Sequence, residues 1–135
     1  MAKTFKLNIL TPSKIVVDEE VEKMFTSTSS GLIEILPNHA PIILSTVPCV
    51  TIIYDKQGNK RELFTSKGVI NLSNNEIMFC SDAAEFAEDI DLSRAESAKE
   101  RAEKRLQDSS KIDVARAKLA LARAMTRIDL KKHSV

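Results

Sequence analysis

The sequence is poor in the residue types that mark several classes of protein. Its 135 residues include no tryptophan and only two cysteines, two histidines, three glycines and four prolines. So few cysteines exclude a disulfide-dense secreted domain, and so few glycines and prolines exclude collagen-like chains. No apolar run approaches the roughly 18 residues that cross a bilayer, and the first residues lack the pattern of a signal peptide. We therefore expect a soluble intracellular protein with Cys49 and Cys80 as core thiols.

Motifs for catalysis are missing as well. No glycine is followed by the spacing of a phosphate-binding P-loop, and neither histidine is accompanied by a zinc-binding pattern or by a Gly-x-Ser-x-Gly turn. His39 could in principle serve a catalytic triad, but a loop histidine bonded to the local backbone is the favoured interpretation. We expect no catalytic residues, no metal site and no catalytic cofactor.

The two parts of the chain differ in composition. All aromatic residues, glycines and prolines precede residue 87. Residues 92–135 contain 12 basic and 6 acidic side chains, a net charge of +6. We therefore predict an α+β protein with one domain over residues 1–86 and a second over residues 87–135.

The first part alternates with the period of two that is typical of half-buried strands. Phe5, Leu7 and Ile9 form one such face, and Val21, Lys23 and Phe25 form another. Further sets are Val50, Ile52 and Tyr54 before a turn at Asp55–Asn59, and strands on both sides of a turn at Asn74-Asn75. Pro37 and Pro41 prevent strand pairing across the loop between them. About eight short strands predict an antiparallel β-sandwich or a flattened barrel.

The second part repeats at three and four residues, as in helices. The first predicted stripe is Leu92, Ala95, Ala98 or Lys99, Ala102 and Leu106, and the second is Ile112, Ala115, Leu119, Ala122 and Met125. These stripes predict an antiparallel two-helix hairpin that turns at Ser109-Ser110. Because its apolar face is mostly alanine, the hairpin buries little area and should open at low cost.

Arginines follow the same helical spacing. Asp91 is a plausible N-cap, yet Arg94 occupies the position three residues later where a capping box would have an acid. Arg94 and Arg101 lie seven residues apart on the first predicted helix, and Arg116, Arg123, Arg127 and Lys131 share a face of the second. Converging guanidinium groups would form a phosphate site. An Asp91–Arg94 surface pair, or a basic face that attracts an acidic partner, explains the same residues.

Three segments of the chain are distinctive: Phe5–Pro12, the loop Ile35–Pro41, and Ala84–Asp91. Together they resemble a known family, the epsilon subunits of bacterial F-type ATP synthases. Two positions depart from the family pattern: Glu34 stands where a glycine is common, and Lys67-Gly68 replaces a Gly-Gly pair.

The resemblance implies a non-catalytic subunit of the rotor stalk, which couples proton transport to ATP synthesis. Its sandwich would bind the gamma subunit and the c-subunit ring, as a peripheral protein at the cytoplasmic face of the bacterial cell membrane. Its helices would extend to inhibit ATP hydrolysis, with their basic residues facing an acidic segment of the beta subunit.

The same resemblance implies a regulatory ATP site. Ile90-Asp91-Leu92-Ser93-Arg94-Ala95 matches the family's Ile-Asp-x-x-Arg-Ala motif. Carried over by position, the adenosine would be contacted by Glu85, Ile90, Asp91 and Ala95, and the phosphates by Arg94, Arg101, Arg123 and Arg127.

Two other classes of function are alternatives to a regulatory rotor-stalk subunit. The first is a stand-alone ligand-binding or nucleic-acid-binding module with a basic helical arm. No aromatic residue lies among the basic helices, so a platform for base stacking is missing. The second is a small enzyme, which would depend on His39 alone.

Overall fold

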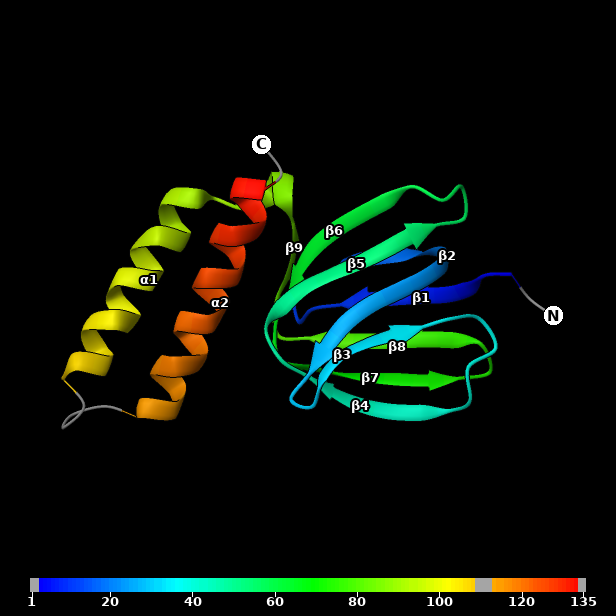
Figure 1. Cartoon of the computed structure of the whole chain (residues 1–135), viewed down its shortest axis with the longest axis horizontal. Coiled ribbons are helices and arrows are strands. Elements are labelled where there is room, and N and C mark those ends of the chain that lie inside the picture. The colour runs from blue at the N-terminus through cyan, green and yellow to red at the C-terminus, as the bar shows by residue number, and fades with distance from the viewer. Residues whose placement is uncertain (1–2, 109–112, 134–135) are drawn as a thin grey trace. The chain divides into compact units, whose positions relative to one another are not determined.

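The computed structural model describes residues 3–108 and 113–133. Contacts divide the chain into two compact units between Glu85 and Phe86. The first unit is built from strands and the second from helices (Figure 1). The chain is thus an α+β protein with a β-sandwich followed by a helical hairpin, as the sequence predicts.

Within the described residues, the sandwich is formed by nine strands. They are β1 (Phe5–Leu10), β2 (Ile15–Thr28), β3 (Gly31–Ile35), β4 (Ile42–Thr46), β5 (Cys49–Asp55), β6 (Lys60–Thr65), β7 (Gly68–Ser73), β8 (Glu76–Ser81) and β9 (Ala84–Phe86). Their order is β4-β7-β8-β1-β2-β5-β6-β9, with β3 beside β2. β1 pairs with β8 in the parallel direction and with β2 in the antiparallel direction. The long strand β2 pairs with three neighbours and so passes from one layer into the other.

The core follows the alternation expected for β1. Phe5, Leu7 and Ile9 are buried, and the residues between them are more exposed. Two further aromatic side chains, Phe64 and Phe79, are fully buried in the same core. Large apolar side chains inside and polar ones outside therefore fix the register of these strands.

The alternation predicted for β2 is wrong beyond Val21. Met24 is fully buried, whereas Lys23 and Phe25 are partly exposed. The register between β2 and β5 shifts between Val21 and Lys23, which marks a β-bulge. Because an inserted residue exchanges the two faces of a strand, Met24 takes the inward position that the alternation predicts for Lys23 and Phe25. Phe25 instead packs edge-on against Tyr54, with the Lys23 ammonium 4.6 Å from the centre of the Tyr54 ring.

In β5 the inward face carries a polar residue that sequence alternation overlooks. Thr51 and Ile53 are fully buried, while Val50, Ile52 and Tyr54 are partly exposed. The Thr51 hydroxyl is 2.9 Å from the hydroxyl of Thr26 and 2.7 Å from that of Thr65. These bonds satisfy hydroxyl groups that would be costly to bury alone.

The cysteine prediction holds only in part, because Cys80 is exposed on β8. Its neighbours Phe79 and Ser81 point inward, so the period of two places Cys80 on the outer face. Cys49 is half-buried, and both cysteines are free thiols.

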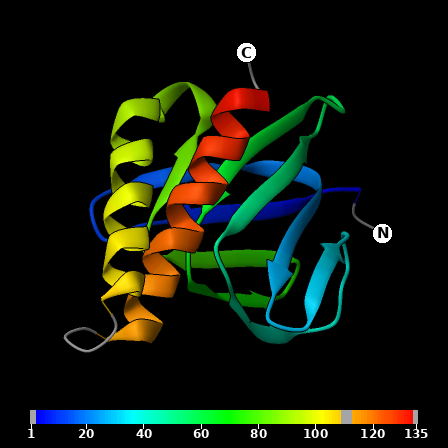
Figure 2. The ribbon, with the colours of Figure 1, turned by 60° about the vertical axis from the view of Figure 1, so that its left-hand side comes forward.

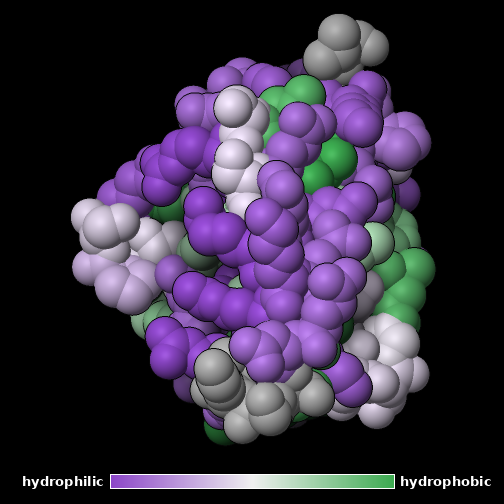
Figure 3. Space-filling model, turned by 90° about the vertical axis from the view of Figure 1, so that its left-hand side faces the viewer, coloured by the Kyte–Doolittle hydropathy of each residue, from purple (hydrophilic) through white to green (hydrophobic). Residues whose placement is uncertain are grey.

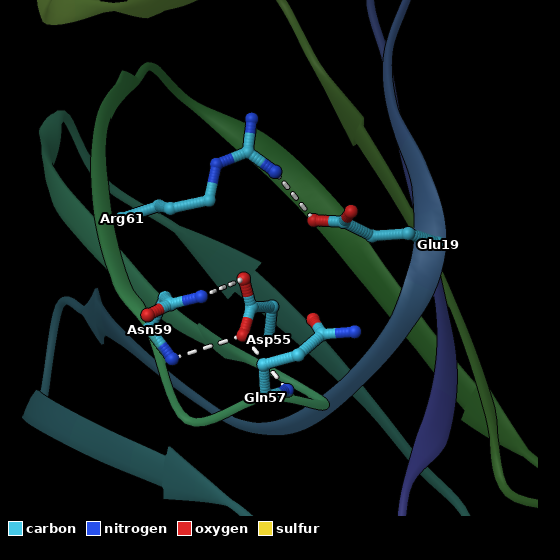
Figure 4. A network of polar contacts seen from close by, with 5 residues as sticks. All are labelled: Glu19, Asp55, Gln57, Asn59 and Arg61. Atoms are coloured by element: carbon cyan, nitrogen blue, oxygen red, sulfur yellow. Dashed lines mark hydrogen bonds and ion pairs between the residues drawn. The ribbon is translucent and has the colours of Figure 1, made fainter.

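The predicted turn after β5 is confirmed (Figure 4). The Asp55 carboxylate accepts hydrogen bonds from the backbone N–H groups of Gln57 and Asn59, both at 2.9 Å. Gly58 has a φ of +84°, a conformation that glycine adopts without strain. On the neighbouring strands, Arg61 donates to Glu19 at 2.6 Å. In the turn, the Asp55 carboxylate thus pairs with backbone N–H groups that form no ladder hydrogen bond.

The proline loop is fastened to the start of β1. The backbone N–H of Asn38 donates to the Asn75 side-chain oxygen at 2.8 Å, and the Asn75 amide donates to the Thr4 carbonyl at 2.8 Å. Nδ1 of His39 is 2.6 Å from the Ala40 carbonyl, so it donates to the local backbone. This contact confirms the favoured interpretation of His39 as a loop residue that bonds its own backbone.

The second unit contains a short 3-10 turn η1 (Ala87–Asp89), helix α1 (Leu92–Gln107) and helix α2 (Val114–His133). The helices lie side by side in both ribbon views (Figures 1 and 2). Ala95 and Ala102 are buried on α1, as predicted. Lys131 donates from its ammonium group to the carbonyl of Ala87 at 3.0 Å, which ties the last turn of α2 to η1.

The stripe predicted for α2 is wrong. The buried residues are Ala117, Ala124, Ile128 and Leu130, whereas Ala115 and Met125 are exposed. Ile112 and the predicted turn at Ser109-Ser110 lie outside the described residues. Alanines occur on several faces of this helix, so a hydrophobic pattern built on them cannot identify the packed face. Within the described residues, neither helix is long and apolar enough to cross a membrane.

Candidate functional site

A groove of about 190 Å³ lies between α1 and α2. Its lining consists of alanines and arginines: Ala98, Arg101, Ala102 and Arg105 from α1, and Ala120, Arg123, Ala124 and Arg127 from α2. Figure 3 shows mostly hydrophilic side chains over the helices. Four of the arginines in the described part of the chain line this groove.

Helical spacing explains why these residues line one groove. Positions separated by three, four and seven residues share a face of a helix, and each helix contributes such a set. The alanines have short side chains, so the two backbones can approach each other. The longer arginines extend from the same faces and carry charge into the groove.

The electrostatics of the groove favour an anion. In the part of the chain that the structure describes, no carboxylate lies within the 4.0 Å of an ion pair from Arg101, Arg105 or Arg123. Arg101 and Arg105 are exposed, and Arg123 is half-buried. Guanidinium groups bind phosphate oxygens through paired N–H donors. Clustered positive charges repel one another until an anion neutralises them.

The structure brings together three of the four arginines expected near phosphates. Arg101, Arg123 and Arg127 line the groove. Arg94 does not line it, although Arg94 lies four residues before Ala98 and so on the same face of α1. The groove therefore points along α1 toward the position of Arg94.

The residues expected near the adenosine differ in how exposed they are. Ile90 and Ala95 are buried, each with 4% of its surface exposed. Glu85 lies half-buried in β9. Asp91 caps α1, because its Oδ1 accepts from the backbone N–H of Arg94 at 3.1 Å. Asp91 therefore has a structural role, because it caps the first turn of α1.

Sequence reasoning missed Arg105 and Asp113. Arg105 follows Arg101 by one helical turn, a spacing that could have placed it in the same set. Asp113 lies at the start of α2 and accepts from the backbone N–H of Arg116 at 3.2 Å. An aspartate just before a helical repeat is a recognised capping signal, and it was available in the sequence.

Family comparisons agree with this architecture over nearly the whole chain. Residues 4–87 match the β-sandwich domain of the ATP synthase delta/epsilon chain, and residues 88–132 match its long α-helix domain. The chain belongs to the ATP synthase delta/epsilon chain family. It is 48% identical over 132 residues to the ATP synthase epsilon chain of Clostridium botulinum strain Alaska E43, covering 98% of both chains.

Other members of the family show the same extent of similarity. The ATP synthase epsilon chain of Clostridium novyi is 43% identical over 130 residues, which cover 96% of this chain and 99% of the relative. The epsilon chain of Desulfitobacterium hafniense strain Y51 is 45% identical over 129 residues, with coverage of 96% and 97%. The resemblance to epsilon subunits is therefore confirmed.

Solved structures support the fold. A chain in the mitochondrial ATP synthase of Euglena gracilis, solved with its F1 part and c-ring, has a TM-score of 0.79 at 17% identity. The match covers 99% of this chain and 82% of that one. A chain of the central stalk and c-ring of the Tetrahymena thermophila enzyme has a TM-score of 0.56 at 12% identity, with coverage of 96% and 94%. The family fold thus persists where sequence identity is low.

Proposed function

We propose that the chain is a non-catalytic central-stalk subunit of a proton-translocating F-type ATP synthase, and that it binds ATP as a regulatory ligand. Family membership supports the place in the complex. The observation that carries the regulatory part is the groove in which Arg101, Arg105, Arg123 and Arg127 converge. One wall of the groove is α1, whose first turn contains the end of the Ile90–Ala95 motif.

The helical hairpin is suited to a change between compact and extended forms. The residues buried on its two helices are mainly alanines, with Ile128 and Leu130 near the end of α2. Burial contributes about 25 cal/mol per Å², so small side chains hold the helices together only weakly. Elements with little buried apolar area open at low free-energy cost. In the extended form, the basic helices would meet an acidic segment of the beta subunit and inhibit ATP hydrolysis.

ATP would oppose this inhibition by binding the compact form. The groove needs both helices, because α1 and α2 each supply two of its arginines. A ligand that binds one conformation shifts the population toward it by its differential affinity. Bound ATP would therefore keep the helices compact and the enzyme free to hydrolyse ATP.

The sandwich would bind the gamma subunit and the c-subunit ring. Large apolar side chains are exposed on it, including Leu32 and Ile43, each with 71% of its surface accessible. Binding a partner would remove these side chains from water. In this role the subunit would be peripheral, held at the cytoplasmic face of a bacterial membrane through the complex.

A truncation tests the inhibitory role. A chain ending at residue 90 keeps β1 to β9 and loses both helices. We expect it to fold, to assemble with the other subunits and to give a complex with higher ATPase activity than the full-length chain gives. Circular dichroism of the truncated chain checks folding, and co-purification with gamma checks assembly. A folded, assembled truncation with unchanged ATP hydrolysis would contradict the inhibitory role.

A further inference from the structure

We propose that Lys131 latches the end of α2 to η1 and so controls how readily the helical hairpin opens. The proposal rests on the change between compact and extended forms proposed above. It goes beyond that change by naming a contact that must break before α2 can move away from η1. Lys131 does not line the groove between the helices, so the latch is separate from the arginines there.

The latch joins the last turn of α2 to the turn that precedes α1. The ammonium group of Lys131 donates a hydrogen bond to the backbone carbonyl of Ala87 at 3.0 Å, across 44 positions of sequence. Since the two helices run in opposite directions, the end of α2 returns to the segment from which α1 starts, and the red end of α2 lies beside η1 (Figure 1). Extension of the hairpin would separate these two segments, so the hydrogen bond would break.

The surroundings of the Ala87 carbonyl strengthen this bond. Ala87 has 7% of its surface exposed and Ile90 has 4%, and Lys131 is half-buried. The same carbonyl accepts the backbone N–H of Ile90 at 3.2 Å, a bond that closes η1. A hydrogen bond from a charged donor is stronger than a neutral one, and partial burial limits its screening by salt. Lys131 therefore ties α2 to the turn that leads into the Ile90–Ala95 motif.

The distribution of buried side chains along the hairpin gives this end its importance. Ile128 and Leu130, the larger side chains buried on α2, lie within one turn of Lys131. Elsewhere the residues buried on the two helices are all alanines: Ala95, Ala102, Ala117 and Ala124. Alanine buries little apolar area, and elements with little buried area open at low cost. A contact at the end of α2 therefore has a large influence on whether the hairpin stays closed.

Hydrogen exchange of the full-length chain, followed by mass spectrometry, tests the latch. Lys131→Met removes the ammonium group but keeps a long unbranched side chain. We expect backbone amides along both α1 and α2 to exchange about five-fold faster or more, because a charge-assisted bond from a half-buried donor is lost. Lys131→Arg keeps a cationic donor and should exchange more slowly than Lys131→Met. Circular dichroism reports the helix content of each variant.

Lys132→Met is the matched control. Lys132 is exposed at the next position of α2, so its loss changes the charge of the last turn by the same amount. Both lysines interact favourably with the C-terminal end of the helix dipole, and this effect is common to the two variants. We expect Lys132→Met to exchange within about two-fold of the parent, since exposed charges contribute little. The difference between the two variants measures the contacts of the Lys131 ammonium group.

ATP hydrolysis by the assembled complex separates the latch from the function proposed above. An opened hairpin should lower the hydrolysis rate with Lys131→Met about two-fold or more relative to Lys132→Met. Faster exchange with unchanged hydrolysis would support the latch and reject the inhibitory role.

Two results of the exchange experiment would overturn the latch. The first is equal exchange in Lys131→Met and Lys132→Met. The second is faster exchange confined to the last turn of α2, because local fraying leaves the hairpin closed. Complete loss of the helical signal in Lys131→Met alone would be the extreme form of the expected opening and would support the latch.

Discussion

The Oδ1 atom of Asp91 accepts a hydrogen bond from the backbone N–H of Arg94 at 3.1 Å. The contact satisfies a backbone donor in the first turn of α1, which has no partner within the helix. It joins Asp91 to Arg94 through the Arg94 backbone and does not involve the Arg94 guanidinium. A residue expected beside a ligand therefore also fixes where the helix begins.

Replacing Asp91 should destabilise the helical hairpin of the ligand-free chain. We expect Asp91→Ala to cost about 1 kcal/mol of helix stability, because alanine cannot cap. Asp91→Asn keeps a side-chain oxygen at the cap and should cost less. Thermal unfolding followed by circular dichroism at 222 nm measures the loss. Equal stability of the parent and Asp91→Ala would show that the cap contributes nothing.

Replacing Arg94 should weaken ATP binding without removing the cap. The cap uses the backbone N–H of Arg94, which Arg94→Ala retains. A charge-assisted hydrogen bond contributes roughly 1.5–3 kcal/mol, so we expect affinity to fall about 10- to 150-fold. Arg123→Ala should behave in the same way, because Arg123 lines the groove. Calorimetric titration with ATP gives the affinities.

The control for that experiment is Lys56→Ala in the turn after β5. Lys56 is exposed on the sandwich, so its loss changes the net charge equally and leaves the helices intact. It should bind ATP like the parent chain. If Arg94→Ala and Lys56→Ala bind ATP equally well, the Ile90–Ala95 match marks only the start of a helix.

Gly68 should not tolerate a side chain. A Cβ atom built there would lie 2.2 Å from the carbonyl oxygen of Cys80, on the paired strand β8. Relieving the clash requires the backbone to move, so we expect Gly68→Ala to cost about 2 kcal/mol or more. Urea unfolding followed by circular dichroism would measure it. Gly58→Ala is the comparison: its Cβ would meet nothing within 4 Å, and its positive φ alone should cost about 1 kcal/mol.

Asp55 should make the sandwich sensitive to acid. The backbone N–H of Asn59, with further donors on Asn59 and Gln57, lowers the pKa of Asp55 below its ordinary value of 3.8. A carboxyl group whose pKa is lower when folded stabilises the protein above the unfolded pKa, and this stabilisation is lost as the pH falls through the folded pKa. We expect Asp55→Asn to be less stable than the parent at pH 7 and the difference to shrink below about pH 3.8. Urea unfolding at pH 7 and pH 3 measures this. A difference that is unchanged across that range would exclude the charge of Asp55 as its cause.

The sequence determined the architecture, because the signals for it are local. Alternation in Phe5, Leu7 and Ile9, and the capping position of Asp91, depend on neighbouring residues in the chain. The turn at Asp55 also follows from its own residues, whose side chains and glycine satisfy the backbone. The composition change near residue 86 likewise separates a sandwich from a hairpin without reference to any contact.

The tertiary structure decided which faces are buried and which arginines meet. The bulge after Val21 exchanges the faces of β2, and it depends on pairing with a strand about thirty residues away. The packed face of α2 could not be read from a helix with alanines on several sides, so Ala124 and Ile128 took the place predicted for Met125. Arg105 joined Arg123 only because α1 and α2 pack together. Contacts between residues distant in sequence are set by packing of the whole unit, which local patterns do not encode.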